Sequence, residues 1–146
     1  MDPELFDAIG RFFAEEIPFN RFLGMRLDAM EPGFARLSLP FRGELVGDPI
    51  RPALHGGVIA TLLDTCGGAA LWSQLTMGDR VSTVDIRVDY LRPGRLEGLI
   101  AEGRVRRVGN RMGVVAVAAF HEGGEHEPVA EARAVYNIRR VRDGAR

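Results

Sequence analysis

The spacing of apolar residues predicts a helix at the start of the chain and a pair of strands after it. Within residues 3–16 the apolar positions fall at helical intervals, which is typical of an amphipathic helix, and the pattern stops before Pro18. The apolar residues that set this spacing are Leu5, Phe6, Ile9, Phe12 and Phe13. Residues 22–30 and 34–40 are expected as strands, because the proline and glycine between them suit a tight hairpin turn.

The middle of the chain predicts a loop followed by a long helix. Residues 41–54 hold glycines and prolines with little periodicity, so they predict a loop that shapes the entrance to a site. From residue 57 to residue 75 the pattern is helical, and apolar residues surround much of the helix circumference. We therefore expect this helix to be largely buried in the core.

The last part of the chain predicts strands joined by turns. Residues 83–90 alternate between polar and apolar side chains, as a half-buried strand does. The apolar members of this alternation are Val84, Ile86, Val88 and Tyr90. Further strands are expected at residues 96–108, 114–120 and 129–139, with turns at Gly109-Asn110 and Gly123-Gly124.

The order of these elements predicts the fold class. A helix, a hairpin, a long buried helix and a meander of about four strands give an α+β fold, with one antiparallel sheet curved around a central helix. The 146 residues suit a single domain, 1–146, with its own core. Residues 1–20 form its N-terminal helical segment, and the Arg-rich residues 140–146 are expected to be a frayed tail.

Composition and charge exclude several classes of partner. With 19 basic and 20 acidic residues the formal net charge is -1, which gives no overall attraction to nucleic acid or to an anionic membrane. The single cysteine, Cys66, cannot form an internal disulfide, and no signal-peptide pattern opens the chain, so a reducing cytoplasmic setting is expected. The longest apolar region contains Asp64 and two glycine pairs, which argues against a membrane span. The three histidines and the cysteine form no ligand cluster, so no metal is expected.

The most informative segment is residues 55–65, which opens with two glycines and carries one carboxylate, Asp64, among apolar residues. Such an acid must reach water or a polar partner, because burying an unpaired charge is prohibitive. Functional sites are enriched in residues of this kind. Two structural alternatives stay open: the glycines merely permit a tight entry into the helix, or Asp64 is a buried partner for Arg87.

Two motifs resemble the hotdog-fold thioesterases of the phenylacetate-pathway (PaaI-like) type. One is His55-Gly56-Gly57 followed by Asp64, and the other is the segment 83–93, which ends in Leu91-Arg92-Pro93. The likeness extends over nearly the whole chain. It implies a hotdog fold, hydrolysis of acyl-CoA thioesters, and a homodimer that is commonly doubled into a tetramer.

Attack on a thioester needs a donor for the oxyanion and a base or nucleophile. Gly56 and Gly57 lie where the predicted helix begins, so unpaired N–H groups and the positive end of the helix dipole face outward with no Cβ to obstruct a ligand. The resemblance assigns the oxyanion donor to Gly56, and such a donor contributes about 3 kcal/mol, or 10²–10³ in rate. Asp64 is the expected general base on a water, or the nucleophile that forms a transient anhydride.

The distance between these two groups predicts a composite site. The eight residues from Gly56 to Asp64 correspond to about 12 Å of helix rise, too far for both groups to serve one carbonyl carbon. If two central helices run antiparallel across a two-fold axis, the Gly56 end of one approaches Asp64 of the other, and two equivalent sites form. We therefore expect an obligate dimer with shared active sites.

Three further residues are candidates for catalytic or supporting roles. His55 is a general base by type, but its position just before a helix favours a supporting role. The resemblance places a hydroxyl near the attacking water at Thr83, which is otherwise an ordinary strand residue. In some relatives an asparagine lies near the thioester or water, which makes Asn20 a candidate, although a turn from helix to strand explains it too.

Substrate binding calls for cations and an apolar pocket. Coenzyme A carries phosphates, so we expect cations at the tunnel mouth, although surface solubility explains the same arginines equally well. The candidate cations are Arg92, Arg106, Arg107 and Arg111. The acyl pocket is expected to use Phe41, Leu45, Val46, Leu54 and the helix face near Leu63.

Three functional classes compete on these residues. The leading one is a hydrolase of acyl-CoA thioesters, with an aryl-acetyl or medium-chain acyl group, coenzyme A as part of the substrate, and no cofactor. The second is a lyase on the same fold that hydrates or dehydrates an acyl thioester, with His55 and Asp64 as its acid-base pair. The third is a non-catalytic acyl-CoA binding module, which would tolerate the loss of Asp64.

Overall fold

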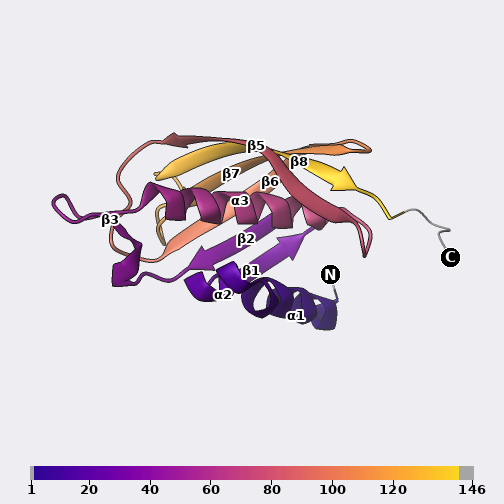
Figure 1. Cartoon of the computed structure of the whole chain (residues 1–146), viewed down its shortest axis with the longest axis horizontal. Helices are drawn as coiled ribbons and strands as arrows, with labels where there is room; N and C mark the ends of the chain where they lie inside the picture. The colour runs from indigo at the N-terminus through magenta and orange to yellow at the C-terminus, as the bar shows by residue number, and fades with distance from the viewer. Residues whose placement is uncertain (1, 142–146) are drawn as a thin grey trace.

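A helix of 17 residues, α3 (Gly56–Trp72), packs against one face of a six-stranded antiparallel sheet in the computed structural model, which describes residues 2–141 (Figure 1). The helix contacts β2, β5, β6, β7 and β8, so the sheet curves around it. The strand order is β1-β2-β6-β7-β8-β5. The bounds are β1 (Arg26–Glu31), β2 (Phe34–Leu39), β5 (Arg80–Tyr90), β6 (Leu99–Val108), β7 (Met112–Phe120) and β8 (Ala130–Arg139). This arrangement confirms the predicted fold class.

The meander that follows α3 is shorter than predicted. Consecutive strands β6, β7 and β8 pair with one another, but β5 pairs with β8 and not with β6, and β2 takes the place beside β6. The expectation of four strands in sequence order was therefore wrong. As a result β5, the strand directly after α3, lies at the edge of the sheet, and no strand within residues 2–141 pairs with its outer side.

The N-terminal segment is helical for longer than the sequence pattern predicts. It contains α1 (Pro3–Arg11), a π-helical turn (Phe12–Glu16) and α2 (Pro18–Leu23). Pro18 does end the first helix, but it also begins the next one, because proline fits the first turn of a helix. Gly24, with φ of 73°, ends α2, so the first strand starts at Arg26 and not at residue 22.

The segment 41–54 is more ordered than the predicted loop. It forms a short 3₁₀ turn (Gly43–Leu45) and a small hairpin of β3 (Val46–Asp48) and β4 (Ala53–Leu54). Only His55 separates this hairpin from α3, and the His55 N–H donates to the Leu45 carbonyl in the 3₁₀ turn.

Strand β5 carries a bulge that the alternating pattern does not predict. The register with β8 shifts between Thr83 and Asp85, which leaves Val84 as the extra residue with 58% of its surface exposed. The prediction that Val84 shares the buried face of Ile86 and Val88 was therefore wrong. The bulge changes the phase of the strand, so that Thr83 and Tyr90 both reach α3.

The core confirms the structural interpretation of the cysteine. Cys66 is fully buried on α3, and its thiol lies 3.4 Å from each of the carbonyl oxygens of Ala35 and Ala101. Burial raises the pKa of this thiol to about 12, so it stays protonated and unreactive.

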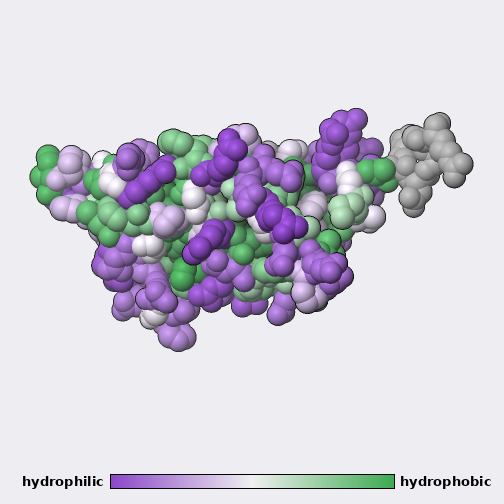
Figure 2. Space-filling view, turned by 90° about the horizontal axis from the view of Figure 1, so that it is seen from below, coloured by the Kyte–Doolittle hydropathy of each residue, from purple (hydrophilic) through white to green (hydrophobic). Residues whose placement is uncertain are grey.

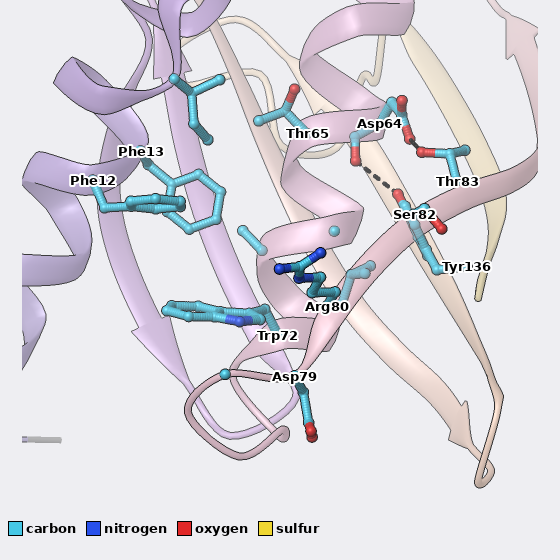
Figure 3. A pocket seen from close by; sticks show the side chains of 15 residues that line it. Phe12, Phe13, Asp64, Thr65, Trp72, Asp79, Arg80, Ser82, Thr83 and Tyr136 are labelled. Atoms are coloured by element: carbon cyan, nitrogen blue, oxygen red, sulfur yellow. Dashed lines mark hydrogen bonds between the residues drawn. The ribbon is translucent and has the colours of Figure 1, made fainter. Parts of the chain in front are cut away.

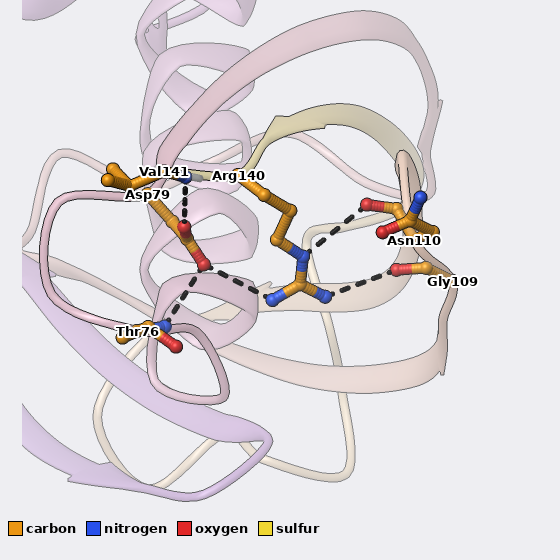
Figure 4. Close-up of polar contacts among 6 residues, drawn as sticks. All are labelled: Thr76, Asp79, Gly109, Asn110, Arg140 and Val141. Carbon is orange, nitrogen blue, oxygen red and sulfur yellow. Dashed lines mark hydrogen bonds and ion pairs between the residues drawn. The ribbon is translucent and has the colours of Figure 1, made fainter. Parts of the chain in front are cut away.

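The loop after α3 is tied to the end of the sheet by Asp79 (Figure 4). Its buried carboxylate accepts the Val141 N–H at 2.9 Å, the Thr76 N–H at 3.1 Å and Arg140 Nη1 at 3.2 Å. Arg140 also donates to the carbonyls of Gly109 and Asn110 in the β6–β7 turn. The predicted tail at 140–146 thus begins with two bonded residues, and residues 142–146 lie outside the described part.

The outer surface mixes charged and apolar side chains. The side that carries α1 and α2 shows separate apolar patches among hydrophilic residues (Figure 2). Phe19 and Phe22 of α2 are exposed and stack with their ring centroids 6.3 Å apart, and the Arg42 guanidinium lies 4.7 Å from the Phe22 ring centroid. No helix within residues 2–141 is both long enough and apolar enough to cross a membrane.

Candidate active site

Asp64 lies in the middle of α3 and is held by two hydroxyl groups from the sheet (Figure 3). Thr83 Oγ1 donates to the Asp64 carboxylate oxygen Oδ1 at 2.8 Å, and the Tyr136 hydroxyl donates to the Asp64 backbone carbonyl at 2.7 Å. Within the described residues, Oδ2 of Asp64 has no hydrogen-bond partner. One carboxylate oxygen is therefore fixed, and the other is free for water or substrate.

Two structural features bring the hydroxyls to Asp64. Thr83 faces α3 because of the bulge at Val84, and it is paired across the strands with Tyr136 of β8. Tyr136 itself lies on the buried face of β8, where inward residues alternate with exposed ones. The same cross-strand pair therefore delivers both donors to one helical residue.

Tyr136 is a residue that sequence reasoning missed. Burial first, and then the negative charge of Asp64, raise the pKa of the Tyr136 phenol, so it remains a protonated donor. The alternation of β8 predicts its burial, and a buried tyrosine hydroxyl usually finds a partner. The identity of that partner depends on strand register, which the pattern does not define.

The start of α3 presents a free backbone donor. The His55 side chain caps the helix, since its Nδ1 accepts the Gly57 N–H at 2.9 Å. No hydrogen bond engages the Gly56 N–H within residues 2–141, whereas the Gly56 carbonyl accepts the Tyr90 hydroxyl at 2.7 Å. Gly56 can therefore donate to a ligand, while His55 and Gly57 are occupied with each other.

Within one chain, Gly56 and Asp64 lie far apart along α3. Eight residues of α3, about 12 Å of rise, lie between them. Asp64 faces a cavity of about 540 Å³, and Gly56 lines a different one of about 410 Å³. Leu54 and Arg92, both predicted to contact substrate, line the cavity at Gly56.

The cavity at Asp64 lies between the N-terminal segment, α3 and the start of β5. Aromatic side chains form much of its wall: Phe12 stacks on Trp72 with ring centroids 6.2 Å apart, and Phe13 meets the same indole edge-on (Figure 3). These three residues were not predicted as pocket residues. Their spacing predicts only the faces of a helix, whereas the cavity depends on the packing of the π-helical turn against Trp72 of α3, which is a tertiary contact.

Several predicted binding residues lie elsewhere. Phe41, Leu45, Val46 and Leu63 do not line the cavity at Asp64; Leu45 and Leu63 are buried in the core. Asn20 is also buried, and its Nδ2 donates to the Phe13 carbonyl at 3.0 Å. Asn20 therefore stabilises the N-terminal segment that carries the cavity wall.

The four arginines predicted to bind coenzyme A phosphates do not lie together at one opening of the structure. Arg92 follows β5 near the start of α3, and its Nε donates to the Pro128 carbonyl. Arg107 is exposed at the far end of the sheet, and Arg106 and Arg111 line separate surface grooves. Arg87 pairs with Asp89 at 3.3 Å, so it is not the partner of Asp64.

Within the described part of the chain, no three or more histidine, cysteine, aspartate or glutamate side chains gather into a group that could bind a metal ion.

The sequence and the fold are similar to those of known proteins. The Thioesterase superfamily profile matches residues 52–127. The chain is 38% identical to the medium/long-chain acyl-CoA thioesterase YigI of Escherichia coli K12, with 89% of this chain and 91% of the relative covered.

Two solved structures are similar over nearly their whole length. A Shewanella oneidensis protein related to the thioesterase superfamily has a TM-score of 0.81 and 29% identity, with 95% of this chain and 100% of that chain covered. A thioesterase family protein from Silicibacter pomeroyi has a TM-score of 0.80 and 27% identity, with 91% and 97% covered.

Proposed function

This chain belongs to the thioesterase superfamily, and we propose that it hydrolyses acyl-CoA thioesters to a free acid and coenzyme A, with Asp64 as general base or nucleophile. The observation that carries the proposal is the environment of Asp64. Its carboxylate lies in the middle of an apolar helix, accepts one hydroxyl on Oδ1 and lines a cavity with aromatic walls. Because the relative from Escherichia coli is named for medium- and long-chain acyl-CoA, and the cavity is apolar, we propose the same acyl class for this chain.

The two routes for Asp64 differ in the first bond formed. As general base, Asp64 accepts a proton from water while the water oxygen attacks the thioester carbonyl carbon. Collapse of the tetrahedral intermediate breaks the C–S bond, and the departing thiolate takes up that proton. As nucleophile, a carboxylate oxygen of Asp64 displaces the thiolate, and water then hydrolyses the anhydride. Both routes place negative charge on the carbonyl oxygen, where the Gly56 N–H is the proposed donor.

The proposed site is shared between two copies of the chain. The separation along α3 prevents Gly56 and Asp64 of one copy from acting on the same carbonyl carbon. Strand β5 supports the pairing, since it is 11 residues long, lies at the sheet edge and exposes Val84 and Tyr90. Long exposed edges of this kind are normally paired or blocked. Pairing of β5 with its copy across a two-fold axis would place the two α3 helices antiparallel, so that Gly56 of each approaches Asp64 of the other.

A thiol-release assay over a panel of acyl-CoA substrates tests the proposal. We expect turnover of medium- and long-chain substrates by the wild type. Asp64→Asn should lower kcat by roughly 10²-fold or more while substrate binding persists, because shape is kept and the base is lost. Asp7→Asn, an exposed aspartate on α1, is the matched control and should keep wild-type turnover.

Other outcomes would indicate the competing functions. Near-normal turnover by Asp64→Asn would remove Asp64 from the mechanism. Consumption of an enoyl-CoA without thiol release would indicate a hydratase. Acyl-CoA binding with no turnover of any substrate by the wild type would indicate a binding module.

A further inference from the structure

The chain contains two tyrosines, and both donate hydrogen bonds to backbone carbonyls of α3. Tyr90 of β5 reaches the Gly56 carbonyl, and Tyr136 of β8 reaches the Asp64 carbonyl, each at 2.7 Å. These are the two positions that the proposed function assigns to the oxyanion donor and to the acid.

Helix formation does not require these bonds. A carbonyl inside an α-helix already accepts the N–H four residues further along, so each tyrosine hydroxyl is an additional donor. Because the hydroxyls come from the sheet, they connect it to the helix at two points about 12 Å apart along the axis. Two such points define both the rotation and the axial position of α3 relative to β5 and β8.

The packing around Tyr136 leaves room for this contact. A Cβ at Gly67 would collide with the Tyr136 hydroxyl, so glycine at this position allows the phenol to approach the helix backbone. Tyr136 is paired across the strands with Thr83, whose hydroxyl holds the Asp64 carboxylate. A shift of α3 along β8 would therefore change the distance between Asp64 and Thr83 as well.

We propose, on the basis of the proposed function, that Tyr136 and Tyr90 are positioning residues. Tyr136 sets the Asp64 carboxylate against Thr83 and the cavity, and Tyr90 sets the Gly56 N–H at the entry of α3. Neither phenol takes part in the bond changes. Their contribution is geometric, and a displacement of about 1 Å at a reacting group can cost up to 10²-fold in rate.

Tyrosine-to-phenylalanine variants test this inference, since they remove only the hydroxyl. We expect Tyr136→Phe and Tyr90→Phe each to lower kcat roughly tenfold and to leave KM within about twofold of the wild type. Ser73→Ala is the matched control: its hydroxyl donates to the Ala70 carbonyl of α3 and accepts the Gly33 N–H of the β1–β2 turn, so it also joins helix and sheet, but at the far end from Gly56. It should leave kcat unchanged.

Double-mutant cycles separate positioning from general stabilisation. In the Asp64→Asn background, Tyr136→Phe should have less than about a twofold further effect, because it acts through the group already removed. Tyr90→Phe should keep its full effect there, because the residual rate still depends on the oxyanion donor. A merely structural role of Tyr136 would give the same loss by Tyr136→Phe in both backgrounds.

Each outcome decides the inference. Wild-type kcat in both phenylalanine variants, or equal losses by Tyr136→Phe with and without Asp64, would overturn it while leaving the proposed function intact. If Asp64→Asn itself retains activity, the proposed role of Asp64 is wrong, whatever the tyrosine variants show. Tyr90 is half exposed, so Tyr90→Phe should fold even if Tyr136→Phe does not. Its kcat and KM then decide: a lower kcat at unchanged KM supports the inference, and a wild-type kcat overturns it.

Discussion

At the scale of single residues, Asp64 is compatible with an apolar helix because the sheet supplies its polar partners. The Thr83 hydroxyl satisfies one carboxylate oxygen, and the Tyr136 hydroxyl satisfies the carbonyl of the same residue. Arg87, the alternative partner, is paired with Asp89 instead. Asp64 is therefore half-buried with one oxygen available to a ligand, which is the arrangement that a base or nucleophile needs.

The proposed role of the Gly56 N–H can be tested by removing that hydrogen alone. Gly56 is the first residue of α3, where proline is tolerated, and His55 already has the extended backbone (φ -62°, ψ 127°) that a following proline requires. We expect Gly56→Pro to lower kcat by roughly 10²–10³-fold in the thiol-release assay, with the helix intact. Gly56→Ala keeps the N–H and places its Cβ 3.4 Å from Tyr90, so it should retain most activity. Equal loss in both variants would indicate steric interference and not the loss of a donor.

Sequence motifs and tertiary geometry contributed different parts of the site. The placement of Gly56 and Asp64 on one helix followed from the glycine-opened apolar pattern, and the structure confirms it. Thr83 came from the family resemblance, and its contact with Asp64 depends on a bulge that strict alternation would have excluded. The contacts of Tyr90 and Tyr136 and the aromatic wall could not be predicted, because they follow from strand register and from the packing of the π-helical turn against α3.

At the scale of elements, the loop after α3 depends on one buried carboxylate. The N–H of Val141 first, and then the N–H of Thr76 and the Arg140 guanidinium, lower the pKa of Asp79 below its ordinary value. This clamp joins the end of α3, the start of β5 and the β6–β7 turn (Figure 4). Asp79 also lines the cavity at Asp64, so the clamp borders the proposed acyl pocket.

The sign of the Asp79 contribution predicts how stability depends on pH. Because its folded pKa lies below the unfolded value of about 3.9, the carboxylate stabilises the fold above that pH. This stabilisation is lost as the pH falls through the lowered folded pKa.

We expect Asp79→Asn to unfold several degrees below the wild type at neutral pH, and this gap in unfolding temperature to narrow once the pH falls below about 4. Thermal unfolding followed by circular dichroism at several pH values measures this, with Asp7→Asn as the control that shows no gap. A gap that does not change with pH would contradict the assignment.

Element boundaries show where pattern reasoning succeeds and fails. The long helix, the β1–β2 hairpin and strands β6 to β8 follow from strong local periodicity and turn residues, as at Gly33 with φ of 81°. Helix α2 was missed because Pro18 follows the end of one helical segment and is also the first residue of the next. The place of β5 beside β8 was missed because strand order is a property of the whole sheet and not of any local pattern.

At the scale of the whole molecule, the unpaired edge of β5 is the expected contact between two copies. Val84→Lys places a charge on the exposed bulge, which is how natural edge strands avoid pairing. We expect this variant to sediment as a monomer and to lose roughly 10²-fold or more in kcat, because neither Gly56 nor Asp64 then has its counterpart. Leu5→Lys, an exposed apolar residue on α1, is the control and should keep both mass and activity. A folded, active Val84→Lys monomer would show that one chain holds a complete site.

Complementation between two inactive variants tests the shared site most directly. Asp64→Asn keeps the oxyanion donor and lacks the acid, whereas Gly56→Pro keeps the acid and lacks the donor. In a mixed dimer with antiparallel helices, one site receives both intact groups and the other receives neither. Random association of equal amounts gives mixed dimers in about half of the population, so activity should recover to about a quarter of the wild-type value. Each variant refolded alone is the control. If both groups served one carbonyl within the same chain, every site in the mixture would lack one of them, and verified mixed dimers would show no recovery.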